Sequence, residues 1–201
     1  MGELRILKPV IPMRIIAGLH RGRVLKTLRG QQLRPTSGRL RETLFDVLGD
    51  TVQGAVFVDA YAGSGAVGLE ALSRGAKQAF FLEEYAAACR LLSENIAALG
   101  AARSARLLCG PAHKGLRQLE RQGVRVSFCF LDPPYAIQSE AMKVLLWLAR
   151  RQLMAPDGLI ILQHSRRETT ELRVGTWNRV RLLVHGSNAL SFYQFVSDQT
   201  L

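Results

Sequence analysis

The sequence has few cysteines and no long apolar run. Cys89, Cys109 and Cys129 are widely spaced and form no Cys-x-x-Cys pair, so we expect free thiols in a reducing cytoplasm rather than a zinc site or a disulfide framework. The longest apolar runs, such as residues 159–162, have the length of a strand and fall far short of the roughly 20 residues that span a bilayer. No small-residue cleavage site follows the apolar patch in residues 1–12, so no secretory signal is expected. These absences predict a soluble cytoplasmic protein that does not enter a membrane.

Acidic residues are missing from one long stretch near the amino terminus. Every charged residue from Arg14 to Arg41 is basic, and the first acid after them is Glu42, in a chain of net charge +11 at pH 7. A solvated surface normally mixes both signs of charge, because like charges repel. The unmixed stretch is therefore typical of contact with a phosphate backbone, although a solvated basic arm would have the same composition. Few aromatic residues are interleaved with the charges, so stacking on bases is not predicted here.

Residues 1–50 are predicted to form a basic extension that packs on the main domain. Alternating patterns in residues 13–18 and 23–28 flank a glycine-bearing turn, which is typical of a short hairpin. Thr36 or Ser37 then provides a cap for a helix that carries an apolar stripe. The extension is therefore expected to be a hairpin followed by a helix.

Residues 51–201 are predicted to form a single main domain in which short strands alternate with helices. The strands are nearly all apolar, which indicates a parallel sheet covered by helices on both faces. Two further strand patterns around a Gly-Ser-Asn turn close the chain as an antiparallel hairpin. We therefore expect an α/β fold with a doubly wound, mostly parallel, Rossmann-like sheet. The predicted strands are residues 55–59, 79–82, 106–109, 126–131, 158–163, 180–184 and 190–196, and the predicted helices are residues 66–74, 86–99, 114–121 and 140–152.

Three of the predicted strands end at an acid. These acids are Asp59, Glu83 and Asp132. In an open α/β sheet, ligands bind at the carboxyl ends of the strands, near the point where the strand order reverses. We therefore expect the three carboxylates at one ligand site.

The turn after the first of these strands is rich in glycine. Gly63, Gly65 and Gly68 match G-x-G-x-x-G, and Glu83 lies about twenty residues further on. Glycines admit a ligand close to the backbone, and an acid at this spacing accepts hydrogen bonds from ribose hydroxyls. The pattern fits a dinucleotide and S-adenosylmethionine equally well, and a turn that only packs a helix on a sheet would also satisfy it.

Asp132-Pro133-Pro134-Tyr135, after the fourth strand, favours S-adenosylmethionine. The exocyclic amine of a base is a poor nucleophile, because its lone pair is delocalised into the ring. A carboxylate and a proline carbonyl that accept the amine hydrogens would free this lone pair, while Tyr135 could stack on the base. The two prolines stiffen the turn and offer no competing N–H. The tetrapeptide therefore predicts an amino methyltransferase that works by positioning and electrostatics, with a purely structural turn as the alternative.

The sequence resembles the RsmD-type bacterial methyltransferases, which modify the N2 amino group of a guanine in 16S ribosomal RNA. The resemblance runs from Met13 almost to Phe195. Its amino-terminal segment and Leu190-Ser191-Phe192-Tyr193 are the parts most specific to this family. The family usually starts at a residue like Met13, so residues 1–12 are either an extension or a misassigned start. The other matching stretches are residues 14–18, Arg34-Pro35-Thr36 with Arg39, Arg41, Glu42 and Phe45, and residues 62–65, 69–76, 130–135 and 164–165.

The resemblance implies a class I fold and a set of site residues. S-adenosylmethionine would be held by Asp59, Tyr61, Ala62, Gly63, Gly65, Glu83, Glu84 and Ala112. The guanine would be held by Asp132, Pro133, Pro134 and Tyr135. Ribosomal RNA, either naked or within a partly assembled small subunit, would be held by Arg14, Arg21, Arg23, Lys26, Arg34, Arg39 and Arg41. A monomer is the default expectation.

The sequence departs from the family pattern at the expected adenine site. Such enzymes usually show Gly-Asp-Ala after the third strand, whereas this chain has Gly110-Pro111-Ala112. Loss of one hydrogen bond to the adenine typically costs about 0.5–1.5 kcal/mol, so we expect cofactor binding that is several-fold weaker. Glu84 and Tyr85 are the candidates to line the adenine pocket instead.

Two other functions stay open at this point. The Asp-Pro-Pro-Tyr chemistry would serve equally for the N6 amine of adenine, or another base amine, in DNA or RNA. Pro111 also motivates a non-catalytic RNA-binding or assembly module with a weakened cofactor site. The four histidines show no metal-ligand spacing, so no metal site is expected, and only His164 follows a strand near the expected site.

Overall fold

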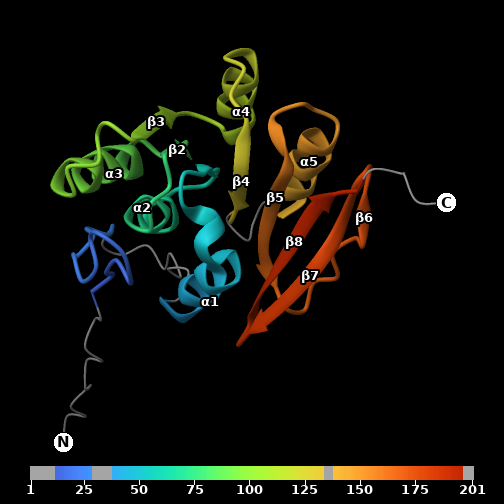
Figure 1. Cartoon of the computed structure of the whole chain (residues 1–201), viewed down its shortest axis with the longest axis horizontal. Coiled ribbons are helices and arrows are strands. Elements are labelled where there is room, and N and C mark those ends of the chain that lie inside the picture. Colours follow the sequence, from blue (N-terminus) through green and yellow to red (C-terminus); the bar gives the residue numbers. More distant parts are fainter. Residues whose placement is uncertain (1–11, 29–37, 134–137, 197–201) are drawn as a thin grey trace, which may run out of the picture.

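Figure 1 shows the computed structural model of the chain, which describes residues 12–28, 38–133 and 138–196. Strands and helices alternate through most of it. The strands are β1 (Val56–Asp59), β2 (Gln78–Glu83), β3 (Ala105–Cys109), β4 (Val126–Leu131), β5 (Met154–Ser165), β6 (Arg173–Val174), β7 (Trp177–His185) and β8 (Asn188–Phe195). The helices are α1 (Gly38–Leu48), the short 3-10 helix η1 (Gly49–Val52), α2 (Ala66–Ser73), α3 (Ala86–Ala98), α4 (Ala112–Arg121) and α5 (Gln138–Ala149).

The strands form an eight-stranded sheet in the order β3-β2-β1-β4-β5-β8-β7-β6. Neighbouring strands from β3 to β5 in this order run parallel, and β8, β7 and β6 pair antiparallel. The chain builds the sheet outward from β1 in one direction and from β4 in the other, so the strand order reverses between these two strands. This confirms the predicted doubly wound, mostly parallel α/β sheet of the Rossmann-like class I type, closed by an antiparallel hairpin.

Residues 12–28 form the predicted hairpin, which we call the arm. Arg14 and Val24 pair across it in an antiparallel bridge. Ile15 and Leu25 are buried in the same apolar cluster as residues of α1 and α2. In Figure 1 the arm (blue) lies beside α2, so the basic amino-terminal segment is packed on the main domain over these residues.

Two apolar layers cover the two faces of the sheet. One layer joins the arm, α1, α2 and α3 to strand residues such as Phe57 and Phe130, and we call this side the arm face. The other layer joins α4 and α5 to strand residues such as Val58 and Leu131, and we call this side the α5 face. Because side chains alternate along a strand, Asp59, two residues after Phe57, belongs to the arm face.

The structure differs from the sequence prediction at several strand ends, among them the start of β7, which is Trp177 rather than residue 180. β5 begins at Met154 rather than at residue 158, because Met154 pairs with Val126 before a register irregularity. Pro156 and Asp157 are exposed and interrupt the apolar pattern there. β6 and η1 were not predicted, since two and four residues are too short to show a periodicity. Within the described part of the chain, no helix is long and apolar enough to cross a membrane.

Candidate active site

The three strand-end acids gather at one edge of the sheet. Asp59 ends β1, Glu83 ends β2, and Asp132 directly follows β4, which pairs with β1. Asp59 is only 2% exposed, whereas Glu83 and Asp132 are half-buried. The negative charges of Asp132 and Glu83 both act on Asp59, so the three carboxylates are close enough to interact.

Asp59 titrates far from the usual range of an aspartate. Burial raises the pKa of Asp59 from 3.8 to about 7, and the charges of Asp132 and Glu83 add to the rise. The amide of Gly68 donates a hydrogen bond of 3.0 Å to Asp59 Oδ2, which favours the charged form and opposes the rise. A cationic group placed beside Asp59 would therefore favour its ionised form.

Glu83 ties the glycine-rich turn to the end of β2. The amide of Gly63 donates a hydrogen bond of 2.7 Å to Glu83 Oε2, and the amide of Tyr85 donates one of 2.8 Å to Oε1. Each oxygen thus accepts one backbone N–H and has the capacity to accept another hydrogen bond. The carboxylate can therefore brace the turn and still accept hydrogen bonds from the hydroxyls of a ribose.

The three glycines of the turn have different surroundings. A Cβ atom at Gly65 would lie 2.2 Å from Leu92 Cδ1, and one at Gly68 would lie 2.3 Å from Phe81 Cε1. Gly68 is therefore required by the packing of α2 against the Phe81 ring, and Gly65 also has a φ of +80°, which favours glycine. A Cβ atom at Gly63, where φ is +53°, would meet no other atom within 4 Å. Of the three, Gly63 is the one whose backbone borders open space and fits the close approach of a ligand.

The other predicted cofactor residues differ in how far they are exposed. Pro111 precedes α4, and its side chain has no atom that could accept a hydrogen bond from an adenine. Its backbone carbonyl accepts the amide of Lys114 at 2.9 Å. Tyr61 and Ala112 are half-buried, Ala62 is buried and Glu84 is exposed.

The predicted catalytic tetrapeptide is described for its first two residues. Asp132 and Pro133 follow β4, and Pro133 is buried. Pro134 and Tyr135 lie outside the described residues, so their roles stay predictions. A buried proline directly after Asp132 restricts the backbone conformation from which this carboxylate extends.

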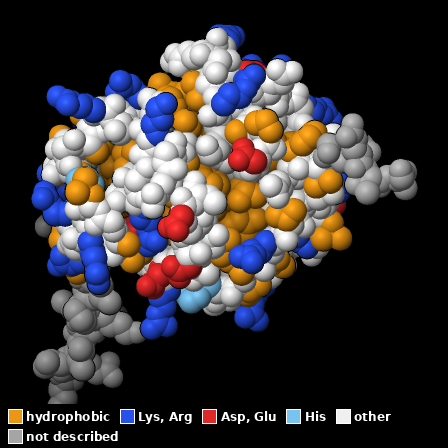
Figure 2. Space-filling view, viewed as in Figure 1, with side chains coloured by type: hydrophobic (Ala, Val, Ile, Leu, Met, Phe, Trp, Pro, Cys, Tyr) orange, Lys and Arg blue, Asp and Glu red, His pale blue; other side chains and the backbone are white. Residues whose placement is uncertain are grey.

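Most of the predicted RNA-binding side chains are exposed. Arg14, Arg21, Arg23 and Arg39 lie at the surface, as does Lys26, which forms an ion pair of 2.7 Å with Glu94. Arg34 lies outside the described residues. Figure 2 shows that Lys and Arg side chains also occur around most of the rim of the face in view, so basic charge is not confined to the arm.

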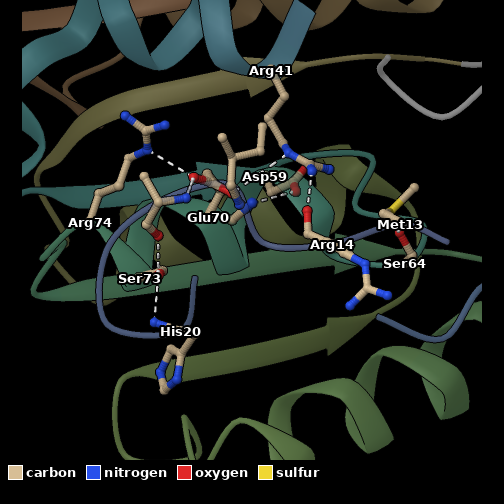
Figure 3. Close-up of polar contacts among 12 residues, drawn as sticks. Met13, Arg14, His20, Arg41, Asp59, Ser64, Glu70, Ser73 and Arg74 are labelled. Atoms are coloured by element: carbon tan, nitrogen blue, oxygen red, sulfur yellow. Dashed lines mark hydrogen bonds and ion pairs between the residues drawn. The ribbon is translucent and has the colours of Figure 1, made fainter. Parts of the chain in front are cut away.

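Arg41 corrects one of these predictions. Its side chain is 2% exposed, and its guanidinium donates to the carbonyl oxygen of Arg14 and lies 3.7 Å from Glu70. Burial lowers the pKa of Arg41, an effect that the charge of Glu70 opposes. Arg41 therefore holds α1 against the arm and does not contact RNA from the surface, as Figure 3 illustrates.

Glu70 on α2 is the centre of this buried cluster, and it was not predicted from the sequence. It is fully buried and accepts hydrogen bonds from the amides of Ile16 at 2.7 Å and Ala17 at 3.0 Å. Arg74, one turn further along, donates to it at 2.8 Å (Figure 3). An acid within the apolar segment of α2 was the available signal, since a buried carboxylate requires partners. Glu70 thus fixes the arm to the helix that begins at the glycine turn.

Asn95 on α3 makes a second connection between the arm and the turn. Its side chain is 2% exposed and exchanges hydrogen bonds with the backbone of Lys26, accepting at 2.9 Å and donating at 3.1 Å. Its amide also donates to the carbonyl oxygen of Ser64 at 2.9 Å. The basic arm and the glycine turn are therefore held by one side chain.

His164, which the sequence placed near the site, faces away from it. It extends from β5 on the α5 face, where it lines a cavity of about 200 Å³ with residues of α5. One ring nitrogen lies 2.9 Å from the Ser165 carbonyl oxygen, the other lies 2.9 Å from Ser191 Oγ, and burial lowers the pKa of His164.

The residue before it, Gln163, was not predicted, although an amide at the end of an apolar strand is a visible signal. It is 7% exposed, and its Oε1 is buried without a hydrogen-bond partner among the described residues.

Comparisons with known proteins give the family of the chain. A family model described as Conserved hypothetical protein 95 matches residues 13–194. The ribosomal RNA small subunit methyltransferase D of Escherichia coli K12 is 35% identical over 90% of this chain and 89% of its own length. The protein of the same name from Haemophilus influenzae is 32% identical over 90% of this chain and 93% of its own.

Solved structures show the same fold. A structure of a hypothetical protein from Thermus thermophilus has a TM-score of 0.76 and 34% identity, covering 90% of this chain and 98% of its own. An RNA methyltransferase from Salinibacter ruber, solved with S-adenosyl-L-homocysteine, has a TM-score of 0.59 at 12% identity, covering 83% of this chain and 96% of its own. The chain therefore belongs to the Conserved hypothetical protein 95 family, which is the family of the RsmD-type methyltransferases.

Proposed function

We propose that this chain transfers a methyl group from S-adenosylmethionine to the N2 amino group of a guanine in small-subunit ribosomal RNA. The observation that carries the proposal is the pairing of two features at one sheet edge. One is the open glycine turn at Gly63, braced by Glu83, and the other is Asp132 with Pro133 after the adjacent strand β4. The names of the relatives from E. coli and H. influenzae support the methyl transfer and the RNA substrate.

The residues at this edge fit the parts of the cofactor. Gly63 borders open space where the methionine part would lie, and Asp59, at the end of the strand before the turn, suits the cationic amino group. Glu83 would accept hydrogen bonds from the ribose hydroxyls. Bound there, the cofactor supplies an electrophilic methyl group on its sulfonium sulfur.

Asp132 and the proline turn act on the amine. The carboxylate of Asp132 and a proline carbonyl accept the two amine hydrogens, which directs the nitrogen lone pair toward the methyl group. When the nitrogen forms its new bond to carbon, the proton that it releases passes to Asp132 or to solvent. Catalysis then consists mainly of positioning and electrostatic stabilisation, with no covalent intermediate on the protein.

The exposed basic residues of the arm and Arg39 would bind the RNA backbone. Their charge fits a polyanion, and the clamp made by Glu70 and Asn95 would hold them at a fixed place relative to the cofactor. The protein would act as a monomer in the cytoplasm. Its RNA substrate would be either naked or within a partly assembled subunit.

Product mapping tests the function. The protein is incubated with labelled S-adenosylmethionine and with small-subunit RNA or particles that lack the modification, and the labelled nucleoside is identified. The proposal predicts N2-methylguanosine. N6-methyladenosine would replace guanine by adenine as the target, and RNA binding without incorporation would support the assembly module suggested by Pro111.

A further inference from the structure

Gln163 carries an unusual polar atom. The residue is more than nine-tenths buried, with 7% of its surface exposed, and its Oε1 has no hydrogen-bond partner in the part of the chain that the structure describes. A buried acceptor is costly to leave unpaired, and roughly nine in ten buried polar groups in native proteins are paired. A buried acceptor without a partner is therefore expected to meet a donor that the described part of the chain does not supply.

The register of the sheet places Gln163 beside the candidate catalytic residue. Leu131 of β4 pairs with Leu162 of β5 in parallel register. Asp132 follows the first of these residues and Gln163 follows the second, so both stand at the same level on adjacent strands. Neighbouring strands in a sheet lie about 4.8 Å apart, a distance that one purine base can span.

Asp132 and Gln163 also belong to the same face of the sheet. Side chains alternate along β5, so Gln163 shares the arm face with Ile161, which packs in the arm-face layer. Asp132 directly follows Leu131 of β4, and its charge acts on Asp59 of the same face. This is the face that carries the arm and α1, and with them the exposed basic side chains of the arm and Arg39. His164, the residue after Gln163, points to the opposite face and has partners for both ring nitrogens.

The chemistry of Gln163 matches one edge of guanine. Next to its N2 amine, guanine carries N1–H, a donor, whereas the ring nitrogen next to the N6 amine of adenine is an acceptor. When the amine of a base lies at Asp132, the ring nitrogen next to that amine would face Gln163 on the adjacent strand. There Oε1 would accept from the N1–H of guanine and would repel the N1 lone pair of adenine. Bases that leave their helix are commonly read by hydrogen bonds to this edge.

We infer that Gln163 is a specificity residue that accepts the N1–H of the target guanine while Asp132 accepts from its N2 amine. The inference rests on the proposed function and names the group that selects guanine over adenine. A site built to bond a substrate N–H strongly rejects an analogue that lacks it, because the buried acceptor is then left unpaired.

The test combines a protein variant with a base analogue. Gln163→Met keeps the length and the buried volume of the side chain but removes both polar groups. Gln194→Met, the same change on β8 at the other end of the β5–β8 pair, is the matched control. The substrates are small-subunit RNA with guanosine at the mapped target, or with 2-aminopurine riboside there, which keeps the 2-amino group but lacks N1–H.

Single-turnover methylation rates give the answer. Wild type and Gln194→Met are expected to methylate guanosine about tenfold faster than 2-aminopurine, the factor that corresponds to about 1.4 kcal/mol. Gln163→Met is expected to lose about tenfold on guanosine and to treat the two bases alike, with unchanged S-adenosylmethionine affinity.

The rates distinguish a failure of this inference from a failure of the proposed function. Equal rates of wild type on the two bases would overturn the inference without any variant, and so would a full preference for guanosine in Gln163→Met. If wild type labels no guanosine N2 at all, the proposed function itself fails.

Discussion

The amide of Gly63 donates a hydrogen bond of 2.7 Å to Glu83 Oε2, and this contact joins the turn after β1 to the end of β2. Glu83 also accepts the amide of Tyr85 at 2.8 Å. One carboxylate thus shapes the turn and presents acceptors beside it. The contact explains why an acid at this distance from the glycines matters even before a ligand binds.

Cofactor binding is expected to depend on Glu83 and on the absence of a side chain at Gly63. Glu83→Ala removes two charge-assisted hydrogen bonds and the ribose acceptor, and Gly63→Val fills the open space. Each change should weaken S-adenosylmethionine binding about tenfold or more in calorimetric titration, and Glu120→Ala on α4 should change nothing. Wild-type affinity in both folded variants would refute the site, and preferential binding of NAD would point to a dehydrogenase.

The raised pKa of Asp59 predicts how stability changes with pH. Since the pKa is about 7 in the fold and 3.8 as the ordinary value, the native state binds more protons than the unfolded state between these pH values. Stability is therefore lost as pH rises from about 4 to about 7. Asp59→Asn removes the titration, so its stability relative to wild type should grow by about 2–3 kcal/mol between pH 5 and pH 8.

Urea unfolding of both proteins at the two pH values checks this prediction. A stability difference between Asp59→Asn and wild type that stays constant from pH 5 to pH 8 would show that Asp59 titrates normally in the fold.

Two glutamates that hold the arm should differ greatly in their contribution to stability. Glu70 is fully buried with several partners, whereas Glu94 is exposed and pairs with Lys26. Glu70→Ala leaves Arg41 and two amides uncompensated and should lower the free energy of unfolding by about 3–5 kcal/mol. Glu94→Ala should lower it by less than about 1 kcal/mol. Equal losses in denaturant unfolding would contradict the clamp.

RNA binding is expected to be electrostatic and to depend on the arm. Replacing Arg21, Arg23 and Lys26 together by Ala should weaken RNA binding and lower the slope of log affinity against log salt by about 0.7–0.9 for each phosphate that is no longer neutralised. S-adenosylmethionine affinity should not change. The matched control is the triple replacement of the exposed residues Lys114, Arg117 and Arg121 on α4, on the opposite face of the sheet. If the control triple lowers the slope and the arm triple does not, the RNA footprint lies on α4.

Much of the fold could be predicted because its strands are short and nearly all apolar. β4 has the predicted bounds, residues 126–131, and Asp59, Glu83 and Asp132 were recognised because each stands where such a strand ends. The start of β5 was missed, since an exposed Pro156-Asp157 pair hides a strand whose pairing comes from a neighbour far along the chain.

The buried polar contacts of the site could not be predicted in the same way. Glu70 meets Ile16 across 54 positions of sequence, and no local pattern encodes such a contact. The burial of Arg41 did have a signal, because it precedes Leu44 and Phe45 by three and four positions and so lies on the buried stripe of α1. Counting basic residues without regard to helical position placed it wrongly at the RNA surface.

The most direct measurement of the central claim is the single-turnover rate of methyl transfer in Asp132 variants, with cofactor and RNA saturating, because product release could otherwise hide the chemical step. Asp132→Ala should slow the transfer by about 10²–10³ while the fold and S-adenosylmethionine affinity stay close to wild type. Asp132→Asn should be nearly as slow if the carboxylate takes up the proton, and partly restored if it only orients the amine. Near wild-type rates in both variants would mean that Asp132 only forms a turn, and the proposed mechanism would be wrong.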